Sequence, residues 1–326
     1  MTGSRTSAEW MERHQVPLYL GGLAAGALLG LLLPSVAEPA ESAVNPVLAL
    51  LLYATFLGIP FARIGAALRD WRFLVAALAV NFLAVPAVVF VLSRLVAQER
   101  ALLVGVLFVL LTPCVDYVIV FAGLAGGAKD RLLAAAPLLM LAQMVLLPAY
   151  LYLFVGDGVV RSIDYAPFGE AFVLIIAVPL ALAALTQVAA ARTRWGARFE
   201  AGVTGTMVPI MVLTLAVVVA SQIDGVRAEL SSLLFALPVY ILFAVVMVPV
   251  GAAAGRIARL DVPGRRSIVF TGVTRNSLVI LPLGLALPAG YDLVPLVIVT
   301  QTLVELVVMV VLVRLVPRLL PDGARV

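Results

Sequence analysis

The sequence predicts an all-α membrane protein: ten transmembrane helices in two inverted five-helix repeats, with broken, crossing helices four and nine. Three observations predict this class, namely the composition, a series of long apolar runs and an internal repeat. Of the 326 residues, 63% are hydrophobic and 12% are charged, whereas soluble domains average ~45–50% apolar and ~25% charged residues. A single cysteine and a single histidine argue against a disulfide framework and a structural zinc site.

Ten apolar runs are each long enough to cross the hydrocarbon, which takes about 20 helical residues. Helices are expected because backbone polar groups in lipid must be hydrogen-bonded within their own segment. The sequence lacks the alternating ten-residue segments that are typical of outer-membrane strands. The predicted spans are residues 16–35, 44–62, 73–93, 101–125, 132–155, 167–190, 203–222, 230–254, 267–288 and 293–314.

The basic residues predict the orientation of these spans. Of the 22 Lys and Arg residues, 17 fall on one side of the membrane and one, Arg275, lies inside a span. Cytoplasmic loops carry the excess of Lys and Arg, so both termini are expected in the cytoplasm. The polar segment 1–14 lacks a cleavage site and is not expected to be a signal peptide. With 21 Arg and abundant Ala, the chain is expected in a bacterial inner membrane. The four basic residues on the outer side are Arg94, Arg100, Arg161 and Arg227.

An internal repeat relates span five to span ten. Pro137 and Gln143 map onto Pro295 and Gln301 with an offset of 158 residues, and the same offset lays span four over span nine. A unit of five spans is odd in number, so its second copy inserts upside down, as in many secondary transporters. The predicted organisation is 1–15 as a cytoplasmic segment, 16–155 as the first repeat, 156–198 as the connection and start of the second repeat, 199–316 as its remainder and 317–326 as a cytoplasmic tail.

Three ionisable residues lie well inside the predicted spans, namely Asp116, Arg275 and Glu305. Each costs at least ~2.5–3.5 kcal/mol at membrane depth on insertion scales, so such residues usually mark function. The structural alternative is a static ion pair of Arg275 with Asp116 or Glu305, which need not stabilise the fold.

Spans four and nine are also interrupted. Pro113 breaks the helical hydrogen bonding in the first, and the polar stretch TGVTRNS from Thr271 interrupts the second. Breaks of this kind leave helix ends and free carbonyls at the midplane, where they can hold a polar solute. The alternative is a simple proline kink. The polar residues expected to line a substrate site are Cys114, Thr112, Thr274, Arg275, Asn276 and Ser277.

Other functions are disfavoured by the motifs that the sequence lacks. It has no phosphate-binding Gly-Lys-Ser/Thr loop and no nucleophile with a base, so neither ATP hydrolysis nor another enzyme activity is expected. No cofactor, resident metal or nucleic acid is expected either. The expected partners are a small inorganic or organic solute, protons and the lipid bilayer, and the sequence leaves a homo-oligomer open.

Span four resembles the matching span of the arsenite efflux permeases, which belong to the bile acid/sodium symporter superfamily. The resemblance is carried by PCVDYVIVF from Pro113, GLA from Gly123 and the pair Lys129-Asp130, and in span ten by Val304-Glu305-Leu306. It covers roughly residues 17–316 and implies ten spans in inverted repeats. It also implies functional roles for Cys114, as a ligand of arsenic(III), and for Glu305; thiolates favour such soft centres.

The sequence departs from this resemblance at three positions. Pro113 stands where the permeases usually have an arginine, and Asp116 where they have a small residue. Arg275 falls where sodium-coupled relatives place uncharged or acidic ligands. A fixed cation repels sodium strongly at low dielectric, so proton coupling through Asp116 or Glu305 is expected instead.

These observations favour a secondary active transporter that exports arsenite or a related trivalent arsenical, driven by protons. The alternative is a transporter of a bile-acid-like organic anion, coupled to sodium or protons, with Arg275 as the partner of the anion. A non-transporting membrane sensor is a third alternative, which is disfavoured because the longest loops are only about ten residues.

Overall fold

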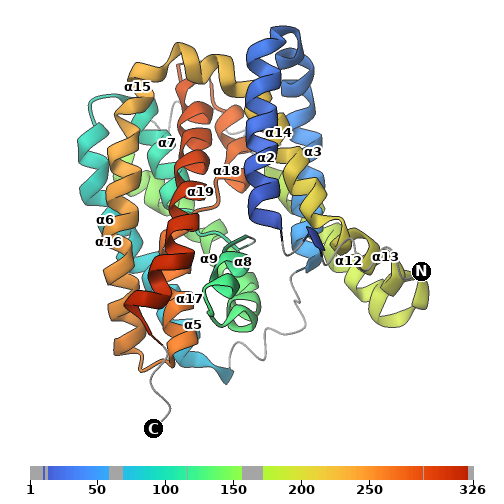
Figure 1. Ribbon diagram of the computed structural model, residues 1–326, viewed down its shortest axis with the longest axis vertical. Helices are drawn as coiled ribbons and strands as arrows, with labels where there is room; N and C mark the ends of the chain where they lie inside the picture. Colours follow the sequence, from blue (N-terminus) through green and yellow to red (C-terminus); the bar gives the residue numbers. More distant parts are fainter. Residues whose placement is uncertain are drawn as a thin grey trace. The chain divides into compact units, whose positions relative to one another are not determined.

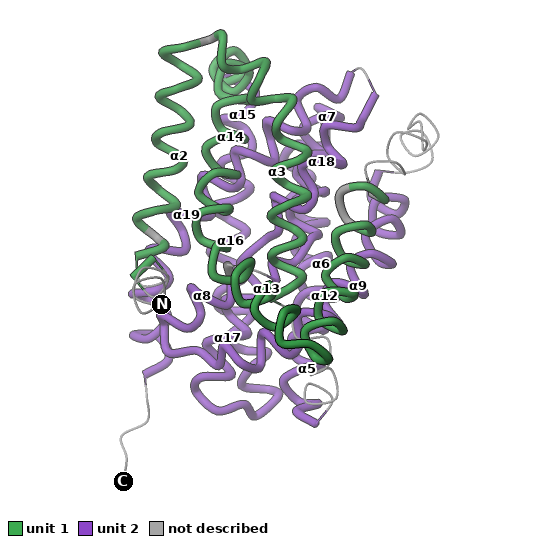
Figure 2. The backbone as a smooth tube through the Cα atoms, turned by 90° about the vertical axis from the view of Figure 1, so that its right-hand side faces the viewer, with its two compact units in different colours: residues 1–58, 165–230 green, residues 59–164, 231–326 purple. Residues whose placement is uncertain are grey.

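The computed structural model describes residues 10–11, 14–58, 69–115, 117–155, 172–288 and 290–321. Helices make up the regular structure of these residues, with one isolated backbone bridge outside them. The chain divides into two compact units, each of which takes one segment from each half of the sequence. Unit 1 contains residues 1–58 and 165–230, and unit 2 contains residues 59–164 and 231–326 (Figure 2).

Unit 1 is built around the long helix α14 (Met207–Ala228), which packs against α2 (Gln15–Leu32) and α3 (Ala37–Gly58) (Figure 1). Three glycines of α2 make this contact close, because a Cβ at Gly22 would lie 2.9 Å from the Val212 carbonyl oxygen. The other helices of the unit are η1 (Pro34–Val36), η5 (Phe172–Ala177), α12 (Val178–Arg192) and α13 (Arg194–Gly205).

Unit 2 holds the buried polar residues that the sequence analysis singled out. Its first segment contains α5 (Trp71–Ala79), η3 (Val80–Ala84), α6 (Val85–Leu92), η4 (Ser93–Val96), α7 (Arg100–Leu110), α8 (Tyr117–Leu124) and α9 (Lys129–Val155). Its second segment contains α16 (Ala236–Ile257), α17 (Val262–Val273), α18 (Ser277–Leu285) and α19 (Leu293–Leu319), and the short α15 (Leu230–Leu234) leads into it from the end of unit 1.

Six helical stretches among the described residues are long and apolar enough to cross a membrane. They are Ala37–Gly58, Trp71–Val96, Lys129–Val155, Met207–Ala228, Leu230–Ile257 and Leu293–Leu319. The expected spans 101–125 and 267–288 do not count among the six, because each is divided into two short helices. In the first expected span, the apolar stretch Pro17–Leu32 of α2 is shorter than these six. In the expected span 167–190, residues 167–171 lie outside the described residues, and the apolar helix Val178–Arg192 is likewise shorter. Ten spans in inverted repeats, and the repeat boundaries, stay predictions.

The helix that starts with α5 contains a π-helical turn, η3, at Val80–Ala84. Pro86 follows this turn and has no N–H to donate to the carbonyl of Phe82, four residues earlier. The hydroxyl of Tyr150 on α9 donates to that carbonyl at 2.5 Å. Because π-turns shift the register of a helix and often occur at functional sites, the position of Asn81 inside η3 is relevant to the site.

Both expected breaks are present in unit 2. Helix α7 ends at Leu110 and α8 begins at Tyr117, while α17 ends at Val273 and α18 begins at Ser277. Pro113 explains the first break, because it lacks an N–H and disfavours helical geometry in the preceding residue. In the second break Asn276 caps α18, since its Oδ1 accepts from the Val279 N–H at 3.3 Å.

Candidate functional site

The two breaks meet and pair through their backbones. Pro113 and Arg275 form an isolated antiparallel bridge. The Asn276 N–H donates to the Thr112 carbonyl at 2.8 Å, and the Cys114 N–H donates to the Thr274 carbonyl at 3.4 Å. Non-helical backbone at membrane depth requires buried partners, and each break supplies them to the other.

Arg275 lies at the centre of this pairing, with a side chain that is 0% exposed. Its Nη1 donates to the carbonyl of Leu110, at the end of α7, at 3.3 Å. Its Nη2 donates to the carbonyls of Thr271 and Gly272, at the end of α17, at 2.6 and 3.0 Å. The last four carbonyls of a helix lack intrahelical donors and carry partial negative charge. The guanidinium therefore caps the C-terminal ends of two broken helices at once.

Asn81 completes the surroundings of this guanidinium. Its Oδ1 accepts from Arg275 Nη2 at 2.8 Å, while its Nδ2 donates to the Thr271 hydroxyl at 3.1 Å and to the Ala77 carbonyl at 3.0 Å. The two Nδ2 contacts fix the amide so that its oxygen faces Arg275. The ring of Phe243 lies on the guanidinium, 5.5 Å from Cζ to the ring centroid, in a cation–π contact.

Glu305 meets the same centre from α19. The residue is 3% exposed, and its Oε2 accepts from the main-chain N–H of Arg275 at 2.8 Å. The side-chain amide of Gln301, one turn earlier on α19, donates to the same oxygen. The Oε1 of Gln301 has no hydrogen-bond partner among the described residues.

A small cavity adjoins Glu305 and Gln301. The volume that the centre of a water molecule can occupy in it is about 10 Å³, so the cavity has room for about one water. The walls consist of apolar side chains from α7, α16, α17 and α19, together with these two polar groups and Tyr240. A water there could bond Glu305 and the unpartnered oxygen of Gln301, so the cavity offers a place for a proton donor or acceptor beside the carboxylate.

The hydroxyl groups of the two breaks are hydrogen-bonded. Thr112 donates to the Phe108 carbonyl at 2.7 Å and Thr274 to the Phe270 carbonyl at 2.5 Å, so each bonds back to the helix that precedes it. The Thr274 hydroxyl also lies 3.7 Å from the sulfur of Met309 on α19. Ser277 accepts from the hydroxyl of Thr302 on α19 at 2.7 Å. The Nδ2 of Asn276 is buried and has no partner among the described residues, so it retains a donor that a solute could use.

The structure thus brings together seven of the eight site residues predicted from the sequence. They are Thr112, Cys114, Thr274, Arg275, Asn276, Ser277 and Glu305, and all are buried in unit 2. The eighth, Asp116, lies outside the described residues. The sequence analysis did not assign Asn81 or Gln301 to the site. The sequence feature that could have pointed to each of them is an amide side chain inside an apolar span. For Gln301, this amide also lies four residues before Glu305.

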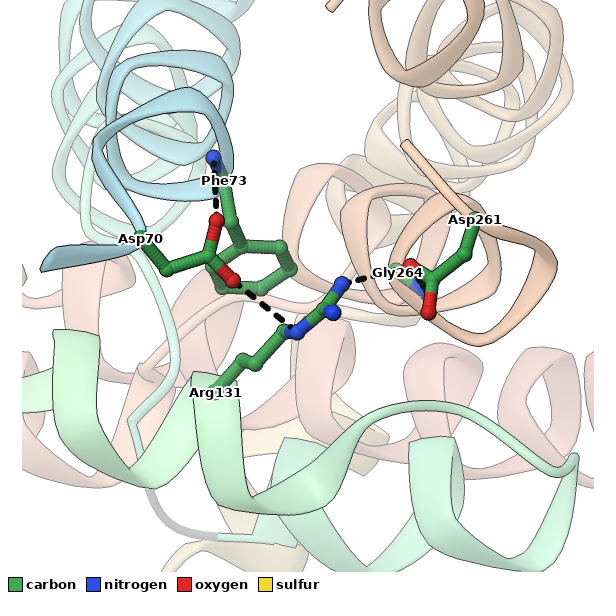
Figure 3. A network of polar contacts seen from close by, with 5 residues as sticks. All are labelled: Asp70, Phe73, Arg131, Asp261 and Gly264. Atoms are coloured by element: carbon green, nitrogen blue, oxygen red, sulfur yellow. Dashed lines mark hydrogen bonds and ion pairs between the residues drawn. The ribbon is translucent and has the colours of Figure 1, made fainter. Parts of the chain in front are cut away.

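A second polar network joins three helix starts of unit 2 (Figure 3). Arg131, in the first turn of α9, contacts Asp70 from Nε to Oδ2 at 3.0 Å and Asp261 from Nη1 to Oδ1 at 2.5 Å. Asp70 caps α5 and Asp261 caps α17, since they accept from the N–H groups of Phe73 and Gly264. These side chains are a third to a half exposed, so the network is accessible to water and salt.

Residues 45–229, more than half of the chain, match the model of the Sodium Bile acid symporter family. The matched region contains the first break, Cys114 and the π-turn with Asn81. No curated protein matches the sequence.

Proposed function

We propose that this chain is a secondary transporter whose transport centre is the meeting point of the two breaks. The chain belongs to the sodium bile acid symporter family. It is therefore a multi-pass membrane transporter rather than an enzyme. The specific function we propose is proton-coupled export of arsenite or a related trivalent arsenical. The observation that carries the proposal is the convergence of Cys114, Glu305 and two half-helix ends at one buried arginine.

Two broken helices that cross are suited to alternating access. Helix ends at the midplane can exchange hydrogen bonds with a solute, and a panel of spans can move against the core of crossed helices that holds the site. The Nδ2 of Asn276, for which the described residues supply no acceptor, supports this role, because a buried donor without a partner costs about 1–3 kcal/mol until something accepts from it.

The cargo chemistry rests on Cys114. A thiol is the side chain that a soft centre such as arsenic(III) prefers. A single sulfur makes a weak site, which suits release of the solute. Hydrogen bonds to hydroxyl groups of the solute would come from the polar side chains of the breaks, namely Thr112, Thr274, Asn276 and Ser277.

The proton coupling rests on Glu305 and Asp116. Glu305 is buried beside a cavity of about one water, and an intramembrane carboxyl in such surroundings is a typical proton carrier. Arg275 stays cationic throughout, since a guanidinium is not deprotonated in proteins. The charge that changes during the cycle would then be that of the carboxyl.

Flux into everted vesicles tests the proposal. Vesicles with an imposed proton gradient should accumulate arsenite, and dissipating that gradient should stop the uptake. Uptake of arsenite that requires a sodium gradient would overturn the coupling that we propose, and absence of arsenite uptake under either gradient would overturn the cargo.

A second candidate is transport of a bile-acid-like organic anion with sodium or protons. The family match favours it, and so does the buried guanidinium, which could pair with a carboxylate once the helix carbonyls release it. The same vesicles discriminate the two functions when a labelled bile acid replaces arsenite as the cargo.

The membrane and the orientation belong to the proposal as well. We place the protein in a bacterial inner membrane with both termini in the cytoplasm, and we leave a homo-oligomer open. Fluorescent or phosphatase reporters fused to the C-terminus test the orientation, because each is active on only one side of that membrane.

A further inference from the structure

The oxygen atoms around Arg275 form an unusual set. Three of them, the carbonyls of Thr271 and Gly272 and the Oδ1 of Asn81, lie within 3.0 Å of a single nitrogen, Nη2. A fourth, the carbonyl of Leu110, lies 3.3 Å from Nη1. These oxygens come from three separate helices, α7, α17 and the π-turn η3, and they converge on one buried point.

Such a set resembles the environment of a bound metal cation. Hard cations take backbone and amide carbonyl oxygens as ligands, and in transporters the unwound carbonyls and half-helix C-terminal ends coordinate sodium. Two helix C-termini contribute about half an elementary negative charge each. The point therefore requires one positive charge, and the guanidinium provides it.

We infer that the Arg275 guanidinium is a tethered substitute for a bound monovalent cation, so that transport is independent of sodium and a neutral residue at 275 creates a sodium site. The inference rests on the proposed function in treating the chain as an ion-driven transporter. It deepens that function, because a permanent charge leaves only a titrating group to couple the cycle.

The electrostatics support a substitution rather than a shared site. Two like unit charges a few ångströms apart repel strongly even at the effective dielectric constant of a protein interior. Sodium thus cannot join the guanidinium among these oxygens. Without the guanidinium, the same oxygens would be buried and lack donors, which destabilises the fold; bound sodium would relieve that penalty.

The test uses the purified full-length protein, without any cargo, in three salts of equal ionic strength: sodium, potassium and choline chloride at about 0.2 M. The variants are Arg275→Ala, which leaves room for an ion, and Arg275→Lys, which keeps the charge. Arg266→Gln is the matched control, because Arg266 is also a buried arginine of unit 2 but lies outside the break, where it donates to the carbonyls of Leu320 and Gly126. Thermal unfolding is the readout.

For the wild type, and likewise for Arg275→Lys and for Arg266→Gln, the melting temperature should not change from one salt to another. Arg275→Ala should melt lower than the wild type in choline, and sodium should raise its midpoint by about 3 °C or more over choline. A wild type that sodium stabilises over choline contradicts the inference. An Arg275→Ala protein also contradicts it if its thermal midpoint is the same in sodium and in choline, or if the protein cannot be recovered folded in sodium.

The readout separates this inference from the proposed function. Binding of sodium by Arg275→Ala supports the inference even if vesicles carry no arsenite. Arsenite flux driven by protons supports the function even if Arg275→Ala ignores sodium. Stabilisation by potassium as well as sodium would support a cation site of low selectivity.

Discussion

The main-chain nitrogen of Arg275 lies 2.8 Å from Oε2 of Glu305. The backbone of this residue therefore holds the carboxylate, while its side chain caps α7 and α17. These two roles are separable, because a substitution at position 275 changes the capping group and keeps the N–H. Variants of Arg275 thus report on the helix ends and variants of Glu305 report on the carboxyl.

Replacing Glu305 with glutamine should abolish proton-driven uptake and leave solute exchange. The side-chain carbonyl of the new amide can still accept from the Arg275 N–H, so the fold should be retained, whereas the side chain can no longer carry a proton. Uptake into everted vesicles under a proton gradient, compared with exchange at equal solute concentrations, measures the two activities. Glu305→Asp is the control, since it keeps the carboxyl. Wild-type uptake by Glu305→Gln would show that the proton is carried elsewhere.

Replacing Cys114 with serine should lower arsenite uptake at least about tenfold, because a hydroxyl is a hard ligand and a thiolate a soft one. Bile acid uptake, if present, should be unaffected. The residue is 0% exposed and its N–H donates to the Thr274 carbonyl, so a nearly isosteric change should preserve the pairing of the breaks. The thermal midpoint checks that the variant folds. If Cys114→Ser takes up arsenite at the wild-type rate, Cys114 does not bind the cargo and only fills space in the core.

Replacing Gly26 with alanine should destabilise unit 1. The new Cβ would collide with the carbonyl oxygen of Ala216 on α14, and overpacking of this kind typically costs about 1–3 kcal/mol. Gly21→Ala is the matched control on the same helix, where a Cβ meets nothing within 4 Å. That change should be neutral or stabilising, by up to about 1 kcal/mol, because alanine favours helix over glycine. Thermal unfolding in detergent compares them, and equal midpoints would contradict the close α2–α14 contact.

Replacing Arg131 with glutamine should cost little stability. Its ion pairs with Asp70 and Asp261 are partly exposed, and exposed pairs are worth about 1 kcal/mol or less. A double-mutant cycle with Asp261→Asn, which keeps a capping oxygen, should give a coupling that salt weakens. Asp130→Asn is the control, since Asp130 lies beside Arg131 and, with Arg131 and Asp70, lines a pocket of about 260 Å³. A coupling that survives high salt would indicate a stronger role in holding α9 to α17.

The membrane class, the apolar segments, the two breaks and the buried positions of Arg275 and Glu305 could be predicted from the sequence alone, whereas Asp116 stays a prediction. These follow from local chemistry, because hydrophobicity fixes which segments leave water and proline or polar residues interrupt their hydrogen bonding. The residue types at 275 and 305 were enough to indicate a functional centre, as charge at membrane depth is costly wherever it lies.

The contacts of each group could not be predicted from the sequence, because they depend on how distant segments pack. The sequence left open whether Arg275 pairs with a carboxylate or binds an anion; the structure adds that its side chain donates to helix carbonyls and its main-chain N–H to Glu305. Asn81 entered the site through a π-turn whose effect on register is not visible in the composition of the span. Carbonyl oxygens are present in every residue, so which of them lack a donor, and which side chain reaches them, depends on how distant segments pack.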